Sequence, residues 1–84
     1  MAKVEIYTRA TCPYCIRAKR LLDMRGVDYD EKGVEDQAVR SEMIGRSGGR
    51  STVPQIFIDG KHVGGCDDLM ELEQSGRLSG LLAA

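Results

Sequence analysis

The sequence VEIYTRATCPYCIRAKRLL, residues 4–22, decides the fold, because within it an alternating apolar run gives way to a helical one. Residues 3–8 alternate between an apolar face and a more polar face, which predicts a β-strand. From Cys15 onward, apolar residues recur at helical spacing with charged residues between them, which predicts an amphipathic helix ending at Gly26. Cys12 and Cys15 therefore lie at a strand-to-helix junction, one helical turn apart.

The segment Cys12-Pro13-Tyr14-Cys15 has the spacing of a redox-active pair. Pro13 suits the first helical position, because its fixed φ is helical and its missing N–H is not needed there. Cys12 is thus expected to precede the helix, beside unpaired N–H groups that stabilise negative charge. Since the thiolate is the attacking species in thiol–disulfide exchange, Cys12 is the candidate nucleophile and Cys15, inside the helix, the candidate resolving thiol.

Length and composition restrict the class of protein. The chain has 84 residues and a net charge of −1, with 12 basic and 13 acidic residues, so neither nucleic acid nor an anionic membrane is expected as a partner. The N-terminus lacks the apolar run of a secretory signal, and three cysteines do not suit a secreted disulfide framework. We expect one domain over residues 1–84, monomeric and cytoplasmic.

The rest of the chain predicts further strands and helices. They are a strand over 27–30, a helix from Glu35 or Asp36 to about Arg46, strands over 55–58 and 61–64, a helix from Cys66 to Gly76, and a last helical turn over 78–82. The strand at 27–30 follows a helix, so it is expected to run parallel to the first strand. Asp59-Gly60 favours a tight hairpin, so the last two strands are expected to be antiparallel. The predicted order is β-α-β-α-β-β-α.

Four motifs together resemble those of the dithiol glutaredoxins. They are Tyr7 to Arg9, Cys12-Pro13-Tyr14-Cys15, Thr52-Val53-Pro54 and Gly64-Gly65-Cys66-Asp67-Asp68. The resemblance covers nearly the whole chain and implies a thioredoxin fold, an α/β architecture with a four-stranded mixed sheet and helices on both faces. It also implies an enzyme that reduces protein disulfides and glutathione mixed disulfides, with glutathione as reducing co-substrate and no tightly bound cofactor.

The resemblance further implies a glutathione groove, formed by Arg9, Tyr14, Arg40, Thr52, Val53, Pro54, Gly65, Asp67 and Asp68. A cis bond before Pro54 would turn the backbone of Val53 toward the reactive sulfur, where its N–H and C=O could pair with the cysteine of glutathione. Asp67 and Asp68 would receive the γ-glutamyl ammonium, and the N–H groups of their helix would bind its carboxylate.

The resemblance also assigns residues to the glycyl end of glutathione and to the wall of the groove. Arg9 and Arg40 would hold the glycyl carboxylate of glutathione, where a guanidinium can pair with both oxygens. Tyr14 would form the wall beside Cys12. The partners expected are glutathione and disulfide-containing or glutathionylated proteins.

Other interpretations compete with this one. Cys12, Cys15, His62 and Cys66 add up to a zinc ligand set, although Pro13 and the helical pattern place one of them within a helix. An iron–sulfur module is a related alternative, and we expect no metal. The chain has no Trp before its cysteine pair, which favours glutathione over thioredoxin reductase as electron source. Cys66 is either a small buried hydrophobe or an activated thiol, and His62 receives no role.

Overall fold

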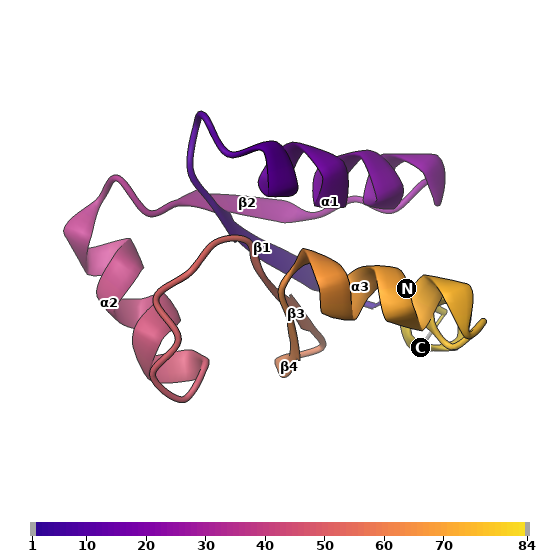
Figure 1. Cartoon of the computed structure of the whole chain (residues 1–84). Helices are drawn as coiled ribbons and strands as arrows, with labels where there is room; N and C mark the ends of the chain where they lie inside the picture. The colour runs from indigo at the N-terminus through magenta and orange to yellow at the C-terminus, as the bar shows by residue number, and fades with distance from the viewer. Residues whose placement is uncertain (1, 84) are drawn as a thin grey trace.

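The computed structural model describes residues 2–83, in which a four-stranded sheet lies between two layers of helices (Figure 1). The elements in chain order are β1 (Val4–Thr8), α1 (Pro13–Met24), β2 (Asp30–Gly33), α2 (Gln37–Arg46), β3 (Gln55–Ile58), β4 (Lys61–Gly64), α3 (Cys66–Gln74) and α4 (Leu78–Leu82). The strand order is β2-β1-β3-β4, with β1 parallel to β2 and the other two pairings antiparallel. The predicted α/β fold and its order of elements are confirmed.

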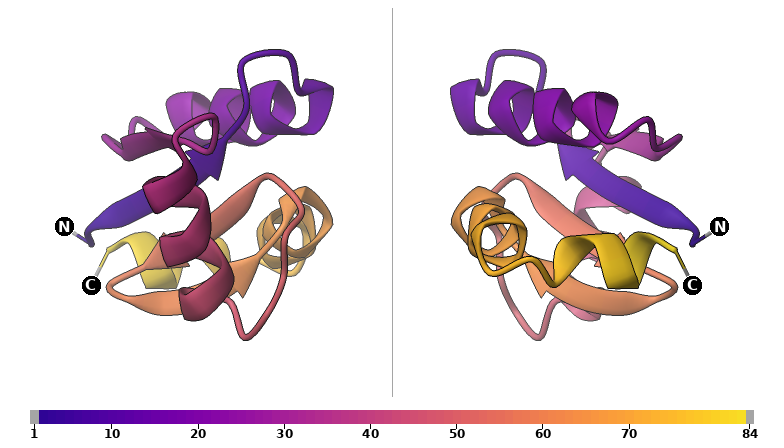
Figure 2. Two further views of the ribbon diagram at one scale, coloured as in Figure 1. Left: turned by 90° about the vertical axis from the view of Figure 1, so that its left-hand side faces the viewer. Right: turned by 90° about the vertical axis from the view of Figure 1, so that its right-hand side faces the viewer.

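Strand β1 is buried on both faces because helices cover both sides of the sheet. Val4 and Ile6 pack in the larger core, with α1, α3 and α4. Tyr7 points to the opposite face and packs with Phe57 and Met43, the latter from α2. Figure 2 shows α2 in front of the strands in its left view, with α1 and α3 behind them.

The strand predicted at residues 27–30 is displaced, and that prediction is wrong. Strand β2 spans Asp30–Gly33 and pairs with β1 from Glu5 to Thr8. Val27 and Tyr29, whose alternation suggested a strand, instead lie in the segment before β2 and pack against the larger core. Apolar alternation gave the wrong position for this strand because β2 lies at the edge of the sheet, where a strand can carry exposed charged side chains.

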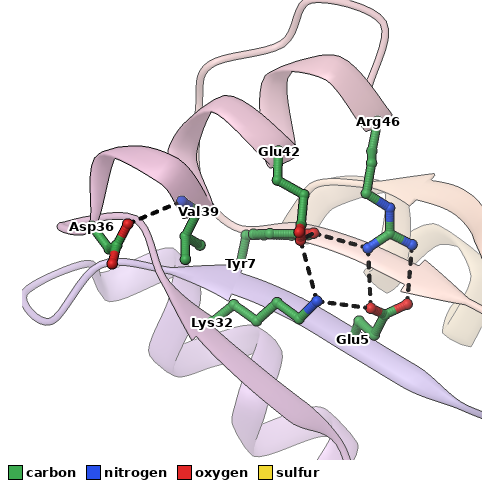
Figure 3. A network of polar contacts seen from close by, with 7 residues as sticks. All are labelled: Glu5, Tyr7, Lys32, Asp36, Val39, Glu42 and Arg46. Carbon is green, nitrogen blue, oxygen red and sulfur yellow. Dashed lines mark hydrogen bonds and ion pairs between the residues drawn. The ribbon is translucent and has the colours of Figure 1, made fainter.

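Helix α2 is joined to the sheet by a network of charged and polar groups (Figure 3). The Arg46 guanidinium donates to both carboxylate oxygens of Glu5, each at 3.0 Å, and to the Tyr7 hydroxyl at 2.8 Å. Lys32 contacts Glu5 at 3.1 Å and Glu42 at 3.2 Å, while the Tyr7 hydroxyl donates to Glu42. A carboxylate inside the sheet is thus paired with two cations, as a buried charge requires.

The predicted helix ends and turns also form. Asp36 caps α2, its Oδ1 accepting the N–H groups of Ala38 at 2.8 Å and Val39 at 3.2 Å. Asp59 and Gly60 have φ values of 52° and 79°, as the tight turn between β3 and β4 requires. Within residues 2–83, no helix combines the length and apolar character needed to cross a membrane.

Candidate active site

Cys12 occupies the capping position of α1, as predicted. Its backbone is extended, with φ −108° and ψ 111°, and Pro13 begins the helix. The Cys15 N–H donates to the Cys12 Sγ at 3.2 Å. A partly exposed sulfur therefore faces the positive end of a helix, an arrangement that stabilises a thiolate.

Cys15 differs sharply from Cys12 in its surroundings. It lies on the core side of α1 and is 0% exposed. Burial, followed by its hydrogen bond with Cys12, raises the pKa of the Cys15 thiol to about 12. At neutral pH Cys15 is a protonated thiol, whereas the more exposed Cys12 is accessible to an approaching disulfide.

The segment opposite Cys12 carries the predicted cis bond. The Val53–Pro54 peptide is cis, and the Cys12 thiol donates to the Val53 carbonyl at 3.8 Å. Pro54 is buried, whereas Thr52 is exposed and Val53 partly so. The backbone before β3 therefore lies directly against the candidate nucleophile.

Two hollows share Thr52 and Val53 in their lining, and Cys12 lines the second of them. The first has a volume of about 310 Å³ and is lined by Tyr14, Arg50, Thr52, Val53, Pro54, Gly65, Cys66, Asp67 and Asp68. The second, of about 440 Å³, is lined by Arg9, Thr11, Cys12, Pro13, Ser51, Thr52 and Val53. The structure thus brings together every predicted groove residue except Arg40, which is exposed on α2 and lines neither hollow.

The two aspartates at the start of α3 have different surroundings. Asp68 Oδ2 accepts the Gly65 N–H at 2.9 Å and lies 3.7 Å from Arg50 Nη1. Gly64 has φ +122°, and a Cβ there would collide with the Asp68 carboxylate, so glycine is required. Asp68 therefore caps the helix, whereas Asp67 is an exposed carboxylate at the rim of the first hollow.

Arg50 and Glu35 contribute to the site, although no role there was predicted for either from the sequence. Arg50 lines the first hollow, and its position directly before the Ser51-Thr52 stretch is the only sequence signal that could have indicated it. Glu35 tethers the loop before Cys12, because its Oε2 accepts the Ala10 N–H at 2.8 Å.

The third cysteine is buried. Cys66 is 5% exposed, packs with the larger core and touches the first hollow. Burial raises the pKa of its thiol, which favours packing over reactivity. Among residues 2–83, no three His, Cys, Asp or Glu side chains are grouped closely enough to hold a metal ion.

One partly exposed and one buried thiol lie at the start of α1 and face a cis-proline segment. This arrangement defines a thiol–disulfide oxidoreductase with the thioredoxin fold. Comparison with known proteins narrows this class. Residues 4–63 match the sequence profile of the glutaredoxin family. The chain is 59% identical to glutaredoxin 3 of Escherichia coli over 83 residues, covering 98% of this chain and 99% of that protein. It is 51% identical to a glutaredoxin of Pseudomonas aeruginosa over 84 residues, covering 100% of both.

Solved structures agree with the sequence relatives. The solution structure of a Brucella melitensis glutaredoxin has a TM-score of 0.84 and 53% identity, covering 98% of this chain and 89% of that one. A buckwheat glutaredoxin–glutathione complex has a TM-score of 0.88 and 32% identity, covering 98% and 77%. The chain belongs to the glutaredoxin family and is a glutathione-dependent thiol–disulfide oxidoreductase.

Proposed function

We propose that Cys12 is the nucleophile of this oxidoreductase and Cys15 its resolving thiol. The observation that supports these roles is the contrast between the two sulfurs: Cys12 is partly exposed at a helix N-terminus, and Cys15 is buried and protonated behind it. Only a sulfur that is both accessible and ionised attacks a substrate disulfide efficiently.

With a glutathionylated protein, the Cys12 thiolate attacks the glutathione sulfur. The mixed disulfide breaks, the protein leaves as a thiolate that takes a proton from water, and glutathione stays bonded to Cys12. A second glutathione thiolate then attacks the bound glutathione sulfur, which releases glutathione disulfide and restores the Cys12 thiolate. This route uses one cysteine.

With a protein disulfide, the first attack leaves Cys12 bonded to one substrate sulfur. Cys15 then attacks Cys12, and its proton passes to the departing substrate thiolate. The products are a reduced protein and a Cys12–Cys15 disulfide, which two glutathione molecules reduce as they become glutathione disulfide. Proximity favours the internal attack, because Cys15 lies one helical turn from Cys12.

Glutathione binds, in this proposal, along both hollows. The backbone of Val53 beside cis-Pro54 pairs with its cysteine, and Asp67 receives the γ-glutamyl ammonium. Arg9 holds the glycyl carboxylate at the other end, while Arg40 stays a sequence prediction only. The buckwheat relative, solved as a glutaredoxin–glutathione complex, supports a groove of this kind.

We further propose that residues 1–84 act as one domain, as a monomer in the cytoplasm. The clients are disulfide-containing or glutathionylated proteins, with neither nucleic acid nor membrane as partner. A dithiol of this kind works in a compartment where glutathione keeps thiols reduced, which supports the location.

Trapping tests the nucleophile directly. In Cys15→Ser, incubation with oxidised glutathione is expected to leave one glutathione on Cys12, because no internal thiol can displace it. Mass spectrometry of proteolytic fragments locates the adduct, and Cys12→Ser serves as control. Glutathione found on Cys66 instead, or on no cysteine, would contradict both the assigned nucleophile and the groove.

The groove assignment predicts a loss of substrate binding in Asp67→Asn. Removing this carboxylate is expected to raise the KM for a glutathionylated peptide about fivefold, the size of one charge-assisted hydrogen bond at an exposed site, with kcat nearly unchanged. Asp28→Asn makes the same charge change at the opposite end of the sheet, near Lys3 and Val4, and is expected to leave KM unaltered. Equal effects in the two variants would indicate long-range charge rather than contact.

A further inference from the structure

Gln55 lies directly after cis-Pro54, and its side chain turns back toward the segment before it. The side-chain Nε2 donates to the Thr52 carbonyl at 3.1 Å and to the Thr52 hydroxyl at 3.2 Å. Because a carbonyl only accepts, the amide nitrogen of Gln55 must face Thr52 and its oxygen must point away. Gln55 is 0% exposed, so each of these polar atoms needs a protein partner.

His62 supplies the partner for the oxygen of that amide. Its Nε2 lies 2.6 Å from Gln55 Oε1, across the β3–β4 hairpin. Since Gln55 Oε1 can only accept, the His62 Nε2 carries the proton. The His62 residue is exposed, and its imidazole lies against the Phe57 ring, with the two ring centroids 4.9 Å apart at an interplanar angle of 30°.

These contacts connect β4 to the segment that faces the nucleophile. They run from His62 to Gln55, from Gln55 to Thr52, and along the backbone to Val53, whose carbonyl lies 3.8 Å from Cys12 Sγ. Val53 is partly buried and packs against the smaller core, whereas Thr52 is exposed, so packing fixes Val53 in part and Thr52 little. The Gln55 side chain restrains Thr52 through two hydrogen bonds, one to its carbonyl and one to its hydroxyl.

We propose that Gln55 and His62 are positioning residues, which hold Thr52 and Val53 in the orientation that receives glutathione beside Cys12. This inference rests on the proposed glutathione groove and deepens it. Neither side chain touches the reacting sulfur. They act by fixing the backbone whose N–H and C=O are proposed to pair with the substrate. This backbone is then already ordered before glutathione binds.

A loss of this restraint is expected to weaken the binding of glutathione and to leave the rate of thiol–disulfide exchange at Cys12 nearly unchanged. Without the His62 N–H, the buried oxygen of Gln55 has no side-chain donor within residues 2–83, and the amide must move to find one. Thr52 and Val53 then sample other orientations, and part of the binding free energy is used to order them. The N-terminus of α1, whose Cys15 N–H faces the Cys12 sulfur, is unchanged.

The test compares His62→Phe with His62→Gln in turnover of a glutathionylated peptide by glutathione. His62→Phe keeps a ring against Phe57 but has no N–H, and it is expected to raise KM about fivefold with kcat within about twofold of wild type. His62→Gln restores an N–H donor on a side chain of similar reach and is expected to recover most of the KM. Gln55→Met, close in shape and without hydrogen bonds, is expected to match His62→Phe.

Three further measurements separate positioning from general loosening. The alkylation rate of Cys12 by iodoacetamide is expected to stay at the wild-type value in His62→Phe, and the melting temperature is measured alongside. In two-dimensional NMR, His62→Phe is expected to move the backbone amide signals of Thr52 and Val53, whereas Lys61→Ala, the exposed neighbour on β4, leaves them in place.

The results that overturn the proposal are specific. They are an unchanged KM in His62→Phe, a KM raised equally by Lys61→Ala, or a loss of kcat and of Cys12 alkylation that follows the melting temperature. The NMR comparison needs no glutathione, so it detects a failed restraint even if the groove itself is elsewhere. Failure of the proposed function alone would appear as absent wild-type turnover with the NMR differences intact.

Discussion

Replacing Cys15 with serine is expected to leave removal of glutathione from a glutathionylated peptide within about threefold of wild type, because that route uses only Cys12. The same variant is expected to lose nearly all reduction of a protein disulfide by the two-thiol route. Its serine hydroxyl occupies the buried position of the thiol but cannot displace the substrate from Cys12. The mixed disulfide then persists until an external thiol reaches it.

Cys12→Ser is expected to lose both activities, by about a thousandfold or more, since every route begins at that sulfur. Turnover of a glutathionylated peptide and of a protein disulfide, each with glutathione as reductant, measures the two routes separately. The double variant Cys15→Ser, Cys66→Ser removes the third thiol and tests whether Cys66 replaces the missing resolving cysteine. An inert Cys15→Ser beside an active Cys12→Ser would reverse the assigned roles.

The parts of the site that are local in sequence could be predicted. The strand-to-helix junction, Pro13 at the helix start and the spacing of Cys12 and Cys15 are read within one short stretch, and the structure places them as expected. The cis bond before Pro54 needed the resemblance to a family, because only the Thr52-Val53-Pro54 motif indicated it. These features depend on residue type at fixed positions.

The parts that depend on distant contacts could not be predicted. Gln55 and His62 look like ordinary polar residues of a hairpin, and only the fold shows that one is buried against Thr52. The position of β2 could not be predicted for the same reason. Its start is determined by pairing with β1, which is distant in sequence, and not by apolar alternation within the strand. Arg46 likewise looks like a solvated helix residue until the sheet places Glu5 beneath it.

Arg46→Met is expected to lower the free energy of unfolding at pH 7 by about 2–3 kcal/mol, because it leaves a buried carboxylate short of its main cation. Glu5 is 6% exposed, and both of its oxygens accept from Arg46. Lys32 remains 3.1 Å away and compensates in part. The guanidinium also lies over the Phe57 ring, 4.1 Å from its centroid, so packing is lost with the charge.

Acid pH provides an independent measure of the same pair. The hydrogen bond from Arg46, opposed by burial and supported by Lys32, lowers the pKa of Glu5 from 4.5 to about 2. A pKa lowered on folding adds stability above the unfolded value, and that stability is lost as pH falls through the folded value. Urea unfolding of the wild type is therefore expected to show a decline between about pH 4.5 and 2, and Arg46→Met a shallower one.

The matched control is Arg77→Met, which removes a cation from an exposed pair. Arg77 lies 3.8 Å from Glu71, with both side chains largely exposed, so its loss is expected to change stability by less than about 0.5 kcal/mol. Equal losses in the two arginine variants, or an unaltered acid profile in Arg46→Met, would contradict the role given to Glu5. A loss confined to Arg46→Met would show that the pairing of Arg46 with the buried Glu5 carboxylate stabilises the contact of α2 with the sheet.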